Sequence, residues 1–205
     1  MSHHLMQHWD ALVPDAHDLG EGLLARWTEP HRDYHGLVHL QHGLAALDAL
    51  GAGRLEYIAW WFHDAVHHND TPNDEQASAA LARQELASLL SPDEVDEVSR
   101  LILLTINHDP RDGDQPGQRL CDADLAMIAT DPDTYDETVQ RLRNERTGHN
   151  DIEWDRSRID FTGRMLNRDR LFHTEAAHDA WEGVARANLT RERERLLNPT
   201  PKDPA

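Results

Sequence analysis

A dipeptide, His63-Asp64, interrupts the most apolar stretch of this chain, which runs from Leu55 to Val66. Burying an imidazole beside a carboxylate is costly unless the two groups are paired or hold a metal ion. Further candidate ligands lie on other predicted elements, His39 upstream and the pair Asp122 and Asp124 downstream. The order His, His-Asp, Asp indicates a metal site with mixed nitrogen and oxygen ligands.

The chain has 205 residues, which suits one domain with a substantial core. No apolar run approaches the ~20 residues that a membrane-spanning helix needs. The N-terminus lacks the basic and apolar segments of a secretion signal. The lone Cys121 cannot form an intramolecular disulfide. We therefore expect a cytoplasmic protein that does not bind membranes.

The formal net charge of −18 argues against binding to nucleic acid, which relies on basic residues that neutralise phosphates. Lys202 is the only lysine, and this excludes a P-loop lysine and a Schiff-base lysine. A small anionic substrate would have to be bound by metal ions and by a few arginines.

The periodicity is helical nearly throughout, because Ala, Leu, Glu and Arg dominate and strand-like alternation is absent. It predicts an all-α fold, a single compact helical domain over residues 1–197 that is followed by a flexible tail, 198–205. Prolines and acidic residues mark several helix starts, and a loop is expected at 109–118. The predicted helices span 5–27, 36–50, 53–68, 73–90, 93–108, 119–129, 132–146, 152–168 and 174–197.

Histidines gather on one face of the helix predicted to start near Tyr34. His35, His39 and His42 fall within an arc of about 60°, opposite a leucine face. His42 is expected to be solvated, whereas His39 and His35 are expected to face the His63-Asp64 pair. His67 follows His63 at the spacing of paired zinc ligands, with a solvated position at the helix end as the alternative.

Two aspartates compete for the last ligand position. Residues two apart point about 200° apart on a helix, so one ion is not expected to take both Asp122 and Asp124. The apolar helical residues after Asp124 favour it as the ligand. Asp122 is expected to be an N-cap or a supporting group.

Further polar residues are candidates for acid–base chemistry or for phosphate binding. His35, His108 and Glu75 are candidate proton donors or acceptors. For His108 and Glu75 the alternatives are a favourable interaction with a helix dipole at the C-terminus and in the first turn, respectively. The candidate phosphate-binding residues, for which solvation or ion pairing is the alternative, are Arg32, Arg143, Arg158 and Arg168.

These stretches resemble the HD-domain superfamily of metal-dependent phosphohydrolases, in particular the group described as predicted HD phosphohydrolases. Residues 30–39, 61–66, 73–79 and 121–125 carry the resemblance. It implies an HD-type all-α fold in which His39, His63, Asp64 and Asp124 bind one divalent metal ion. The residues after His-Asp, Ala65-Val66-His67-His68, match neither the Gly-Lys of signalling phosphodiesterases nor the Glu-Asp of alarmone hydrolases.

The function that we expect is a phosphohydrolase for a small phosphate ester, first of all a nucleotide, in which Asp64 and a metal ion activate water. Two imidazoles and two carboxylates suit Mn²⁺, Fe²⁺, Co²⁺ or Zn²⁺ better than Mg²⁺. Two alternatives stay open, a dinuclear iron oxygenase and a non-catalytic nucleotide-binding module. The oxygenase would need extra ligands from among His35, His67, His68 and His108. Either a monomer or a homodimer is compatible with the sequence.

Overall fold

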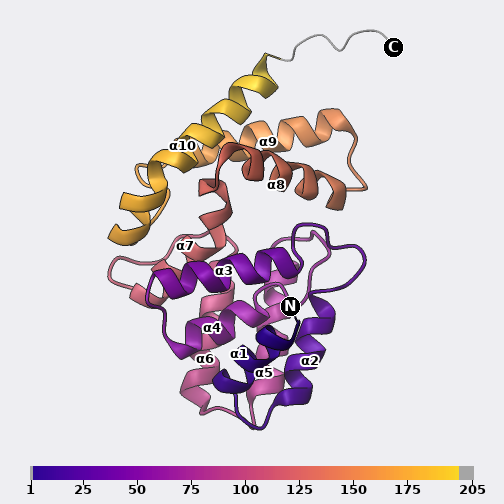
Figure 1. Cartoon of the computed structure of the whole chain (residues 1–205), viewed down its shortest axis with the longest axis vertical. Coiled ribbons are helices and arrows are strands. Elements are labelled where there is room, and N and C mark those ends of the chain that lie inside the picture. The colour runs from indigo at the N-terminus through magenta and orange to yellow at the C-terminus, as the bar shows by residue number, and fades with distance from the viewer. Residues whose placement is uncertain (1, 199–205) are drawn as a thin grey trace.

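The computed structural model describes residues 2–198, and this part of the chain contains helices and no strands (Figure 1). The all-α prediction is confirmed. Apart from Asn198, the predicted tail lies outside the described residues. The helices are α1 (Ser2–Leu12), α2 (His17–Arg26), α3 (Leu37–Ala49), α4 (Arg54–Phe62), α5 (Asn73–Leu86), α6 (Pro92–Leu104), α7 (Gln115–Leu125), the 3₁₀ helix η1 (Ala126–Ala129), α8 (Pro132–Glu145), α9 (Asp151–Leu166) and α10 (Glu175–Leu197).

Two hydrophobic cores lie one above the other along the long axis of the molecule. Helices α1 to α7 enclose the first core, whose largest buried side chains include Trp9, Trp27, Trp60 and Trp61. Helices α8 to α10 enclose the second core and lie together at one end (Figure 1). Trp181 packs against both cores. The second layer therefore covers one end of the first.

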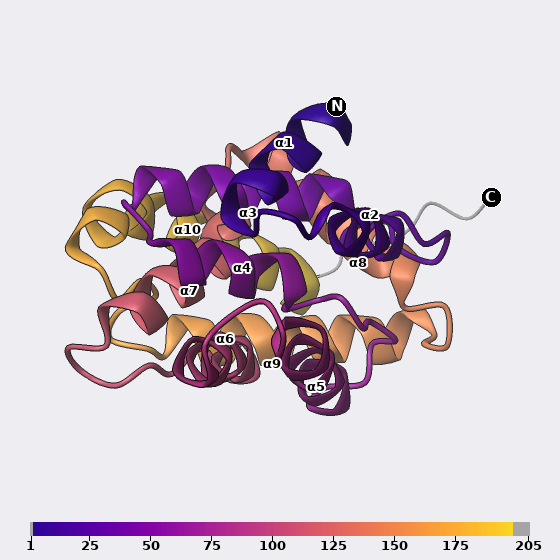
Figure 2. The same ribbon diagram turned by 90° about the horizontal axis from the view of Figure 1, so that it is seen from below.

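Helix α4 is the centre of the first layer. It packs against α1, α3, α5, α6 and α7, and Figure 2 shows it between α3 on one side and the α5–α6 pair on the other. Residues 58–62 of α4 are completely buried, which explains why this helix is apolar on all its faces. The dipeptide that follows α4 consequently lies in the interior of the protein.

Helices α3 and α4 approach each other closely at Gly43. The Trp60 indole lies against this glycine and donates a hydrogen bond from Nε1 to the Leu40 carbonyl at 2.9 Å. A Cβ atom on Gly43 would lie 1.8 Å from Trp60 Cζ2. The missing side chain thus sets the distance between the helix that carries His39 and the helix that precedes His63.

The single helix predicted for residues 5–27 is wrong, because the chain breaks between α1 and α2. Pro14 has no N–H group with which to continue the helix, and Asp15 adopts a left-handed conformation with φ 66°. Trp9 closes the corner by donating from Nε1 to the Ala16 carbonyl at 2.8 Å. Helix α1 can therefore pack against both α2 and α4.

The prediction of a helix over residues 53–68 is also wrong at its C-terminal end, since α4 ends at Phe62. Side chains from other elements take the carbonyl groups at this end. Trp27 Nε1 donates to the Trp61 carbonyl at 3.0 Å, and Arg32 Nη1 donates to the Asp64 carbonyl at 2.6 Å. These partners replace further helical hydrogen bonds, so residues 63–70 form turns.

The helices on both sides of the loop predicted at 109–118 have boundaries earlier in the chain than predicted. Helix α6 ends at Leu104 and not at His108, whose φ of 52° is left-handed. Helix α7 already starts at Gln115, with Asp114 as its N-cap and Pro116 in its first turn. The Ser91 and Glu94 capping box at the start of α6 agrees with the sequence signal.

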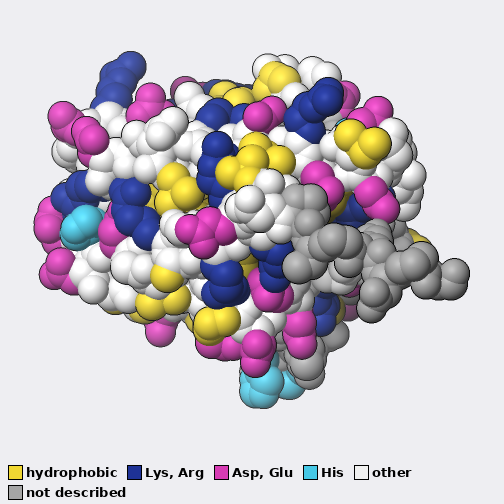
Figure 3. Space-filling view, turned by 90° about the horizontal axis from the view of Figure 1, so that it is seen from above, with side chains coloured by type: hydrophobic (Ala, Val, Ile, Leu, Met, Phe, Trp, Pro, Cys, Tyr) yellow, Lys and Arg dark blue, Asp and Glu magenta, His cyan; other side chains and the backbone are white. Residues whose placement is uncertain are grey.

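No helix in residues 2–198 combines the length and the apolarity that a membrane crossing requires. Basic and acidic side chains are interspersed on the face formed at the α8–α10 end (Figure 3). Asp136, for example, pairs with Arg191 at 3.1 Å and with Arg195 at 3.1 Å. The net negative charge is therefore not gathered on this face.

The close approach at Gly43 leads to a stability prediction. We expect Gly43→Ala to lower the free energy of unfolding by about 2 kcal/mol or more, because the new methyl group would overlap Trp60. Gly183→Ala on α10 is the matched control. A Cβ atom at Gly183 would have no atom of the described residues within 4 Å, and helix propensity should raise stability by about 0.5–1 kcal/mol. Urea unfolding of both variants measures the difference; equal stabilities would contradict this account of the α3–α4 contact.

Candidate metal centre

Four side chains that are distant in the sequence meet at the C-terminal end of α4. His39 comes from α3, His63 and Asp64 follow α4, and Asp124 comes from the last turn of α7. His39 Nε2 is 3.3 Å from His63 Nε2 and 3.2 Å from Asp124 Oδ1. Asp64 Oδ2 is 3.2 Å from His63 Nε2 and 3.6 Å from His39 Nε2. The structure thus brings together the four residues predicted as ligands.

The spacing of these atoms fits a common cation. Ligand atoms about 2.1 Å from an ion and at tetrahedral angles to one another lie about 3.4 Å apart. The imidazole nitrogens of His39 and His63 lie 3.2 to 3.8 Å from oxygen atoms of Asp64 and Asp124, and three of the four residues, His39, His63 and Asp64, form a group that could hold a metal ion. Two imidazoles with two carboxylates are a donor set for a divalent transition metal.

Each imidazole is oriented by its surroundings. His63 Nδ1 donates to the Trp60 carbonyl at 2.8 Å, which leaves Nε2 as the acceptor toward the centre, and its ring stacks on Trp60 at 3.9 Å. The His39 ring packs between Tyr34 and Trp60, with both ring centroids 4.9 Å away. Its buried Nδ1 has no hydrogen-bond partner among residues 2–198, so packing and the contacts of Nε2 with His63 and Asp124 fix this ring.

The charges at the centre balance through protons when no ion is bound. Burial by itself disfavours a charged imidazole, but the carboxylates of Asp64 and Asp124 outweigh it and raise the pKa of His63 to about 9. Burial likewise opposes the ionised form of Asp124, whereas the hydrogen bonds from His108 and His39 hold its pKa well below the usual range. Two carboxylates in the interior therefore demand positive charge, from a proton or from a cation.

The two aspartates of α7 have separate roles. Asp124 Oδ1 faces His39, and its Oδ2 accepts a hydrogen bond from His108 Nε2 at 2.8 Å. Asp122 lies on the other side of α7 and accepts hydrogen bonds from the backbone N–H groups of His173 and Thr174 at 2.7 and 2.8 Å. Asp122 is therefore not the N-cap of its own helix. It holds the start of α10 instead, which agrees with a supporting group.

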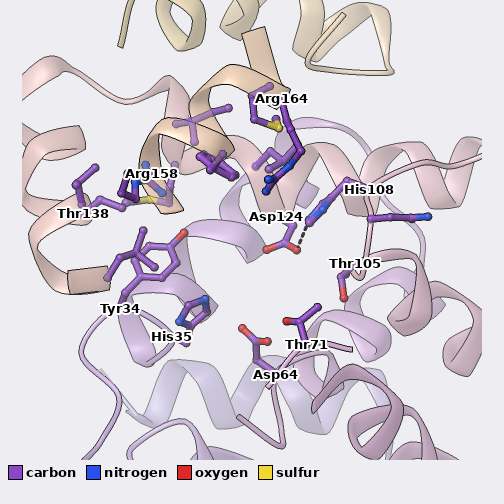
Figure 4. Close-up of a pocket in the computed structure, with 18 of the residues that line it drawn as sticks. Tyr34, His35, Asp64, Thr71, Thr105, His108, Asp124, Thr138, Arg158 and Arg164 are labelled. Carbon is purple, nitrogen blue, oxygen red and sulfur yellow. Dashed lines mark hydrogen bonds and ion pairs between the residues drawn. The ribbon is translucent and has the colours of Figure 1, made fainter. Parts of the chain in front are cut away.

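A cavity of about 650 Å³ opens beside the centre, between the two layers of helices. Figure 4 shows Asp64, Asp124 and His35 turned toward a common space, which α8 and α9 cover from the other side. Glu75 also lines this space; its Oε1 accepts a hydrogen bond from Thr71 at 2.8 Å, and its buried Oε2 has no partner in the described residues. The acid–base candidates His35, His108 and Glu75 therefore all border the cavity.

Glu145, at the end of α8, is a residue that the sequence did not single out. Its side chain is fully buried, and Oε1 accepts hydrogen bonds from the backbone N–H groups of Asp33, Tyr34 and His35 at 2.7 to 2.8 Å. Oε2 accepts a hydrogen bond from His35 Nδ1 at 2.6 Å. This carboxylate ties α8 to the loop before α3 and leaves His35 Nε2 available to the cavity.

Two of the arginines predicted to bind phosphate are placed elsewhere. The buried Arg32 guanidinium donates to the backbone carbonyls of Asp64 and His35, so it shapes the turn after α4. Arg143 lies outside the cavity and pairs with Asp151 at 3.0 Å. Neither arginine faces the space beside the metal centre, because backbone carbonyls and a surface carboxylate already engage them.

The arginines that border the cavity come from α9, from the turn that follows it and from the residue after α8. Arg158 and Arg168 line it as the sequence suggested, but Arg158 is paired with Glu192 at 2.8 Å. Arg164 is exposed and extends from α9 toward Asp124 and His108 (Figure 4). Arg146 and Arg164 were not predicted. The sequence signal for Arg164 is its spacing from Arg158, Phe161 and Arg168, which recur every three or four residues. This spacing points to the cavity only once the structure shows that α9 covers the metal centre.

Comparison with protein-family models finds no matching family, and neither curated proteins nor solved structures give a match. The resemblance to the HD-domain superfamily therefore stays a prediction from the sequence, and the case for a function depends on the geometry described above.

The geometry of the centre leads to a prediction about how ligand substitutions and pH change its metal affinity. We expect His63→Ala and Asp124→Asn to weaken Mn²⁺ or Zn²⁺ binding by more than about tenfold, because the first removes a ligand atom and the second replaces a charged carboxylate by a neutral amide. An ion displaces the proton on His63, so the affinity should rise with pH up to about 9 and then level off. Calorimetric titration of the metal-free protein measures both effects.

His42→Ala is the matched control for these variants, because His42 lies one turn after His39 on α3 and outside the group of four. It should bind the ion as the unmodified chain does, and far-ultraviolet circular dichroism verifies the fold of each variant. Undiminished binding by a folded Asp124→Asn protein would exclude the proposed ligand set.

Proposed function

We propose that this protein is a metal-dependent phosphohydrolase of the HD-domain superfamily that cleaves a small phosphate ester, with nucleotides as the first class to test. The observation that carries the proposal is the convergence of His39, His63, Asp64 and Asp124 at one end of a cavity that arginines border. A centre of this composition beside a basic rim suits an anionic substrate better than a neutral one.

His39, His63, Asp64 and Asp124 would hold a divalent ion at the inner end of the cavity. Such an ion supplies two kinds of chemistry, a lowered pKa of water and polarisation of a phosphoryl oxygen. His108 orients Asp124 through their 2.8 Å hydrogen bond, and the Trp60 carbonyl orients His63. Positioning groups of this kind keep the ligands in place before any substrate arrives.

Arg164 is the best placed phosphate-binding residue. Its guanidinium reaches toward Asp124 from the opposite wall of the cavity (Figure 4). A guanidinium donates two parallel hydrogen bonds to a phosphate, which neutralises charge in the bound substrate and in the transition state. Arg168 lines the same wall but donates to the carbonyls of Asn107 and His108.

Two groups are placed to move protons. Glu75 lines the cavity and its Oε2 has no partner among the described residues, so this carboxylate can accept a proton from an attacking water molecule. His35 is fixed by Glu145 through Nδ1, so its Nε2 can donate a proton to the leaving alkoxide oxygen. The two groups lie on α5 and on the loop before α3, on different walls of the same space.

Phosphate release tests the proposal. The Mn²⁺-loaded protein should liberate inorganic phosphate from at least one member of a panel of nucleotides and phosphomonoesters, and Asp64→Asn should abolish this activity. No turnover across the panel, together with nucleotide binding, would instead indicate a non-catalytic binding module.

Arg164 gives a sharper prediction for the substrate that is found. We expect Arg164→Ala to lower kcat/KM by about 100-fold, because it removes a charged donor from the developing negative charge. Arg143→Ala is the control, since Arg143 lies outside the cavity, and it should retain full activity. Equal activity of the two variants would remove Arg164 from the proposed mechanism.

One observation favours a dinuclear oxygenase as a second candidate. His35, Asp64 and His67 form another group whose ligand atoms lie within 4.8 Å of one another, and it shares Asp64 with the first group. His67 Nε2 is buried without a hydrogen-bond partner in the described residues. Two iron ions per chain, loss of one of them in His67→Ala, and oxygen uptake would support this candidate. One ion per chain and phosphate release would exclude it.

A further inference from the structure

The cavity continues away from the metal centre into a slot between α8 and α9. A second cavity of about 240 Å³ extends the first toward Trp154 and shares with it Leu142, Phe161, Arg146, Arg158 and Arg164. Figure 4 shows Arg158 and Thr138 on the side of the pocket away from Asp64. The combined space is larger than a phosphate group requires, so the outer part is available to the rest of a substrate.

The part of the slot that belongs to the first cavity has an apolar surface, because α8 and α9 turn matching faces to it. Val139 and Leu142 lie three residues apart on α8, and Phe161 and Met165 lie four residues apart on α9, which places each pair on one helix face. Ile128 of η1 adds to the same surface. An aromatic group here would be in contact with hydrocarbon on both sides.

Arg158 contributes a planar guanidinium group to the wall of this slot. It adds little net charge, because Glu192 neutralises it. Both carboxylate oxygens of Glu192 accept hydrogen bonds from its guanidinium at 2.8 Å. The guanidinium carbon lies 4.6 Å from the Phe161 ring centroid, an arrangement in which a planar cation stacks on a ring. Arg158 is therefore not the phosphate-binding group that the sequence suggested, and it forms part of a planar wall.

Helices α8 and α9 contribute no amide and no carboxylate side chain to the lining of this cavity. Such groups, with backbone N–H and C=O groups, read the hydrogen-bonding edge of a nucleobase. The polar groups that α8 and α9 do contribute are three hydroxyls, of Tyr135, Thr138 and Ser157, the indole N–H of Trp154, and the arginines. The slot can thus recognise the size and planarity of a group, but it offers little that would tell one base from another.

We propose that the α8–α9 slot binds an aromatic, weakly hydrogen-bonding group of the substrate while the metal centre binds its phosphate. The substrate class is then a phosphate monoester of an alcohol that carries such a group. This inference rests on the proposed function, because it assumes that a phosphate occupies the inner end of the cavity.

Two esters with leaving alkoxides of similar basicity test the slot. We expect the Mn²⁺-loaded protein to hydrolyse 2-phenylethyl phosphate with a kcat/KM at least about tenfold above that for ethyl phosphate, because the phenyl ring gains a hydrophobic contact. Val139→Phe, which fills the slot, and Phe161→Ala, which removes one wall, should each reduce this ratio toward one. Ile152→Ala is the control on α9, since Ile152 is 73% exposed and does not line the cavity, and it should leave the ratio unchanged.

Nucleotides with different bases give a second measurement. The kcat/KM values for AMP and UMP should differ by less than about tenfold, because no side chain of α8 or α9 selects one base edge. Selectivity far above this value would overturn the proposal. So would equal kcat/KM values for the two alkyl esters.

A binding measurement separates failure of the slot from failure of the proposed function. Calorimetry with 2-phenylethylphosphonate, which cannot be hydrolysed at its P–C bond, reports on the slot whether or not the protein turns over. Phosphonate binding that Val139→Phe weakens, without hydrolysis of any ester, would support the slot and contradict the phosphohydrolase. Hydrolysis of both esters at equal rates, with phosphonate binding that neither slot variant affects, would contradict the slot alone.

Discussion

The structure depends on the compensation of buried charge at the end of α4. Two carboxylates lie next to two imidazoles that are 2% exposed, in a layer of helices that is otherwise filled by tryptophan and leucine. A carboxylate without a partner would be unstable there, so the side chains around Asp64 and Asp124 have to donate hydrogen bonds or carry positive charge. The raised pKa of His63 and the lowered pKa of Asp124 are two consequences of the same requirement.

This arrangement needs the α4 helix to stop at Phe62. The backbone carbonyls that a longer helix would use internally are taken by Trp27 and Arg32 from the preceding segment. His63 and Asp64 can then lie beside His39 of α3 and Asp124 of α7. An apolar helical pattern thus ends where side chains from elsewhere offer better partners.

The second layer of helices, α8 to α10, encloses a cavity beside this centre. Glu145 anchors α8 to the loop that carries His35, and Asp122 anchors the start of α10 to α7. Both are buried carboxylates that satisfy backbone N–H groups of another element, which makes the contact between the layers specific. The cavity between the layers then receives an arginine from α9, and this offsets locally the negative charge of the chain as a whole.

Local patterns in the sequence determined the helical class, most helix starts and the types of ligand at the centre. Apolar periodicity, proline and acidic residues act over one or two turns, and the unusual burial cost of His63-Asp64 is visible in its flanking residues. Tertiary structure alone decided where α4 ends, that the chain breaks between α1 and α2, which backbone groups Asp122 binds, and which arginines border the cavity. Glu145 contacts residues about 110 positions away. Arg143 and Arg164 both lie on helices, but only Arg164 borders the cavity. Such roles follow from the packing of one layer on the other, which no short segment encodes.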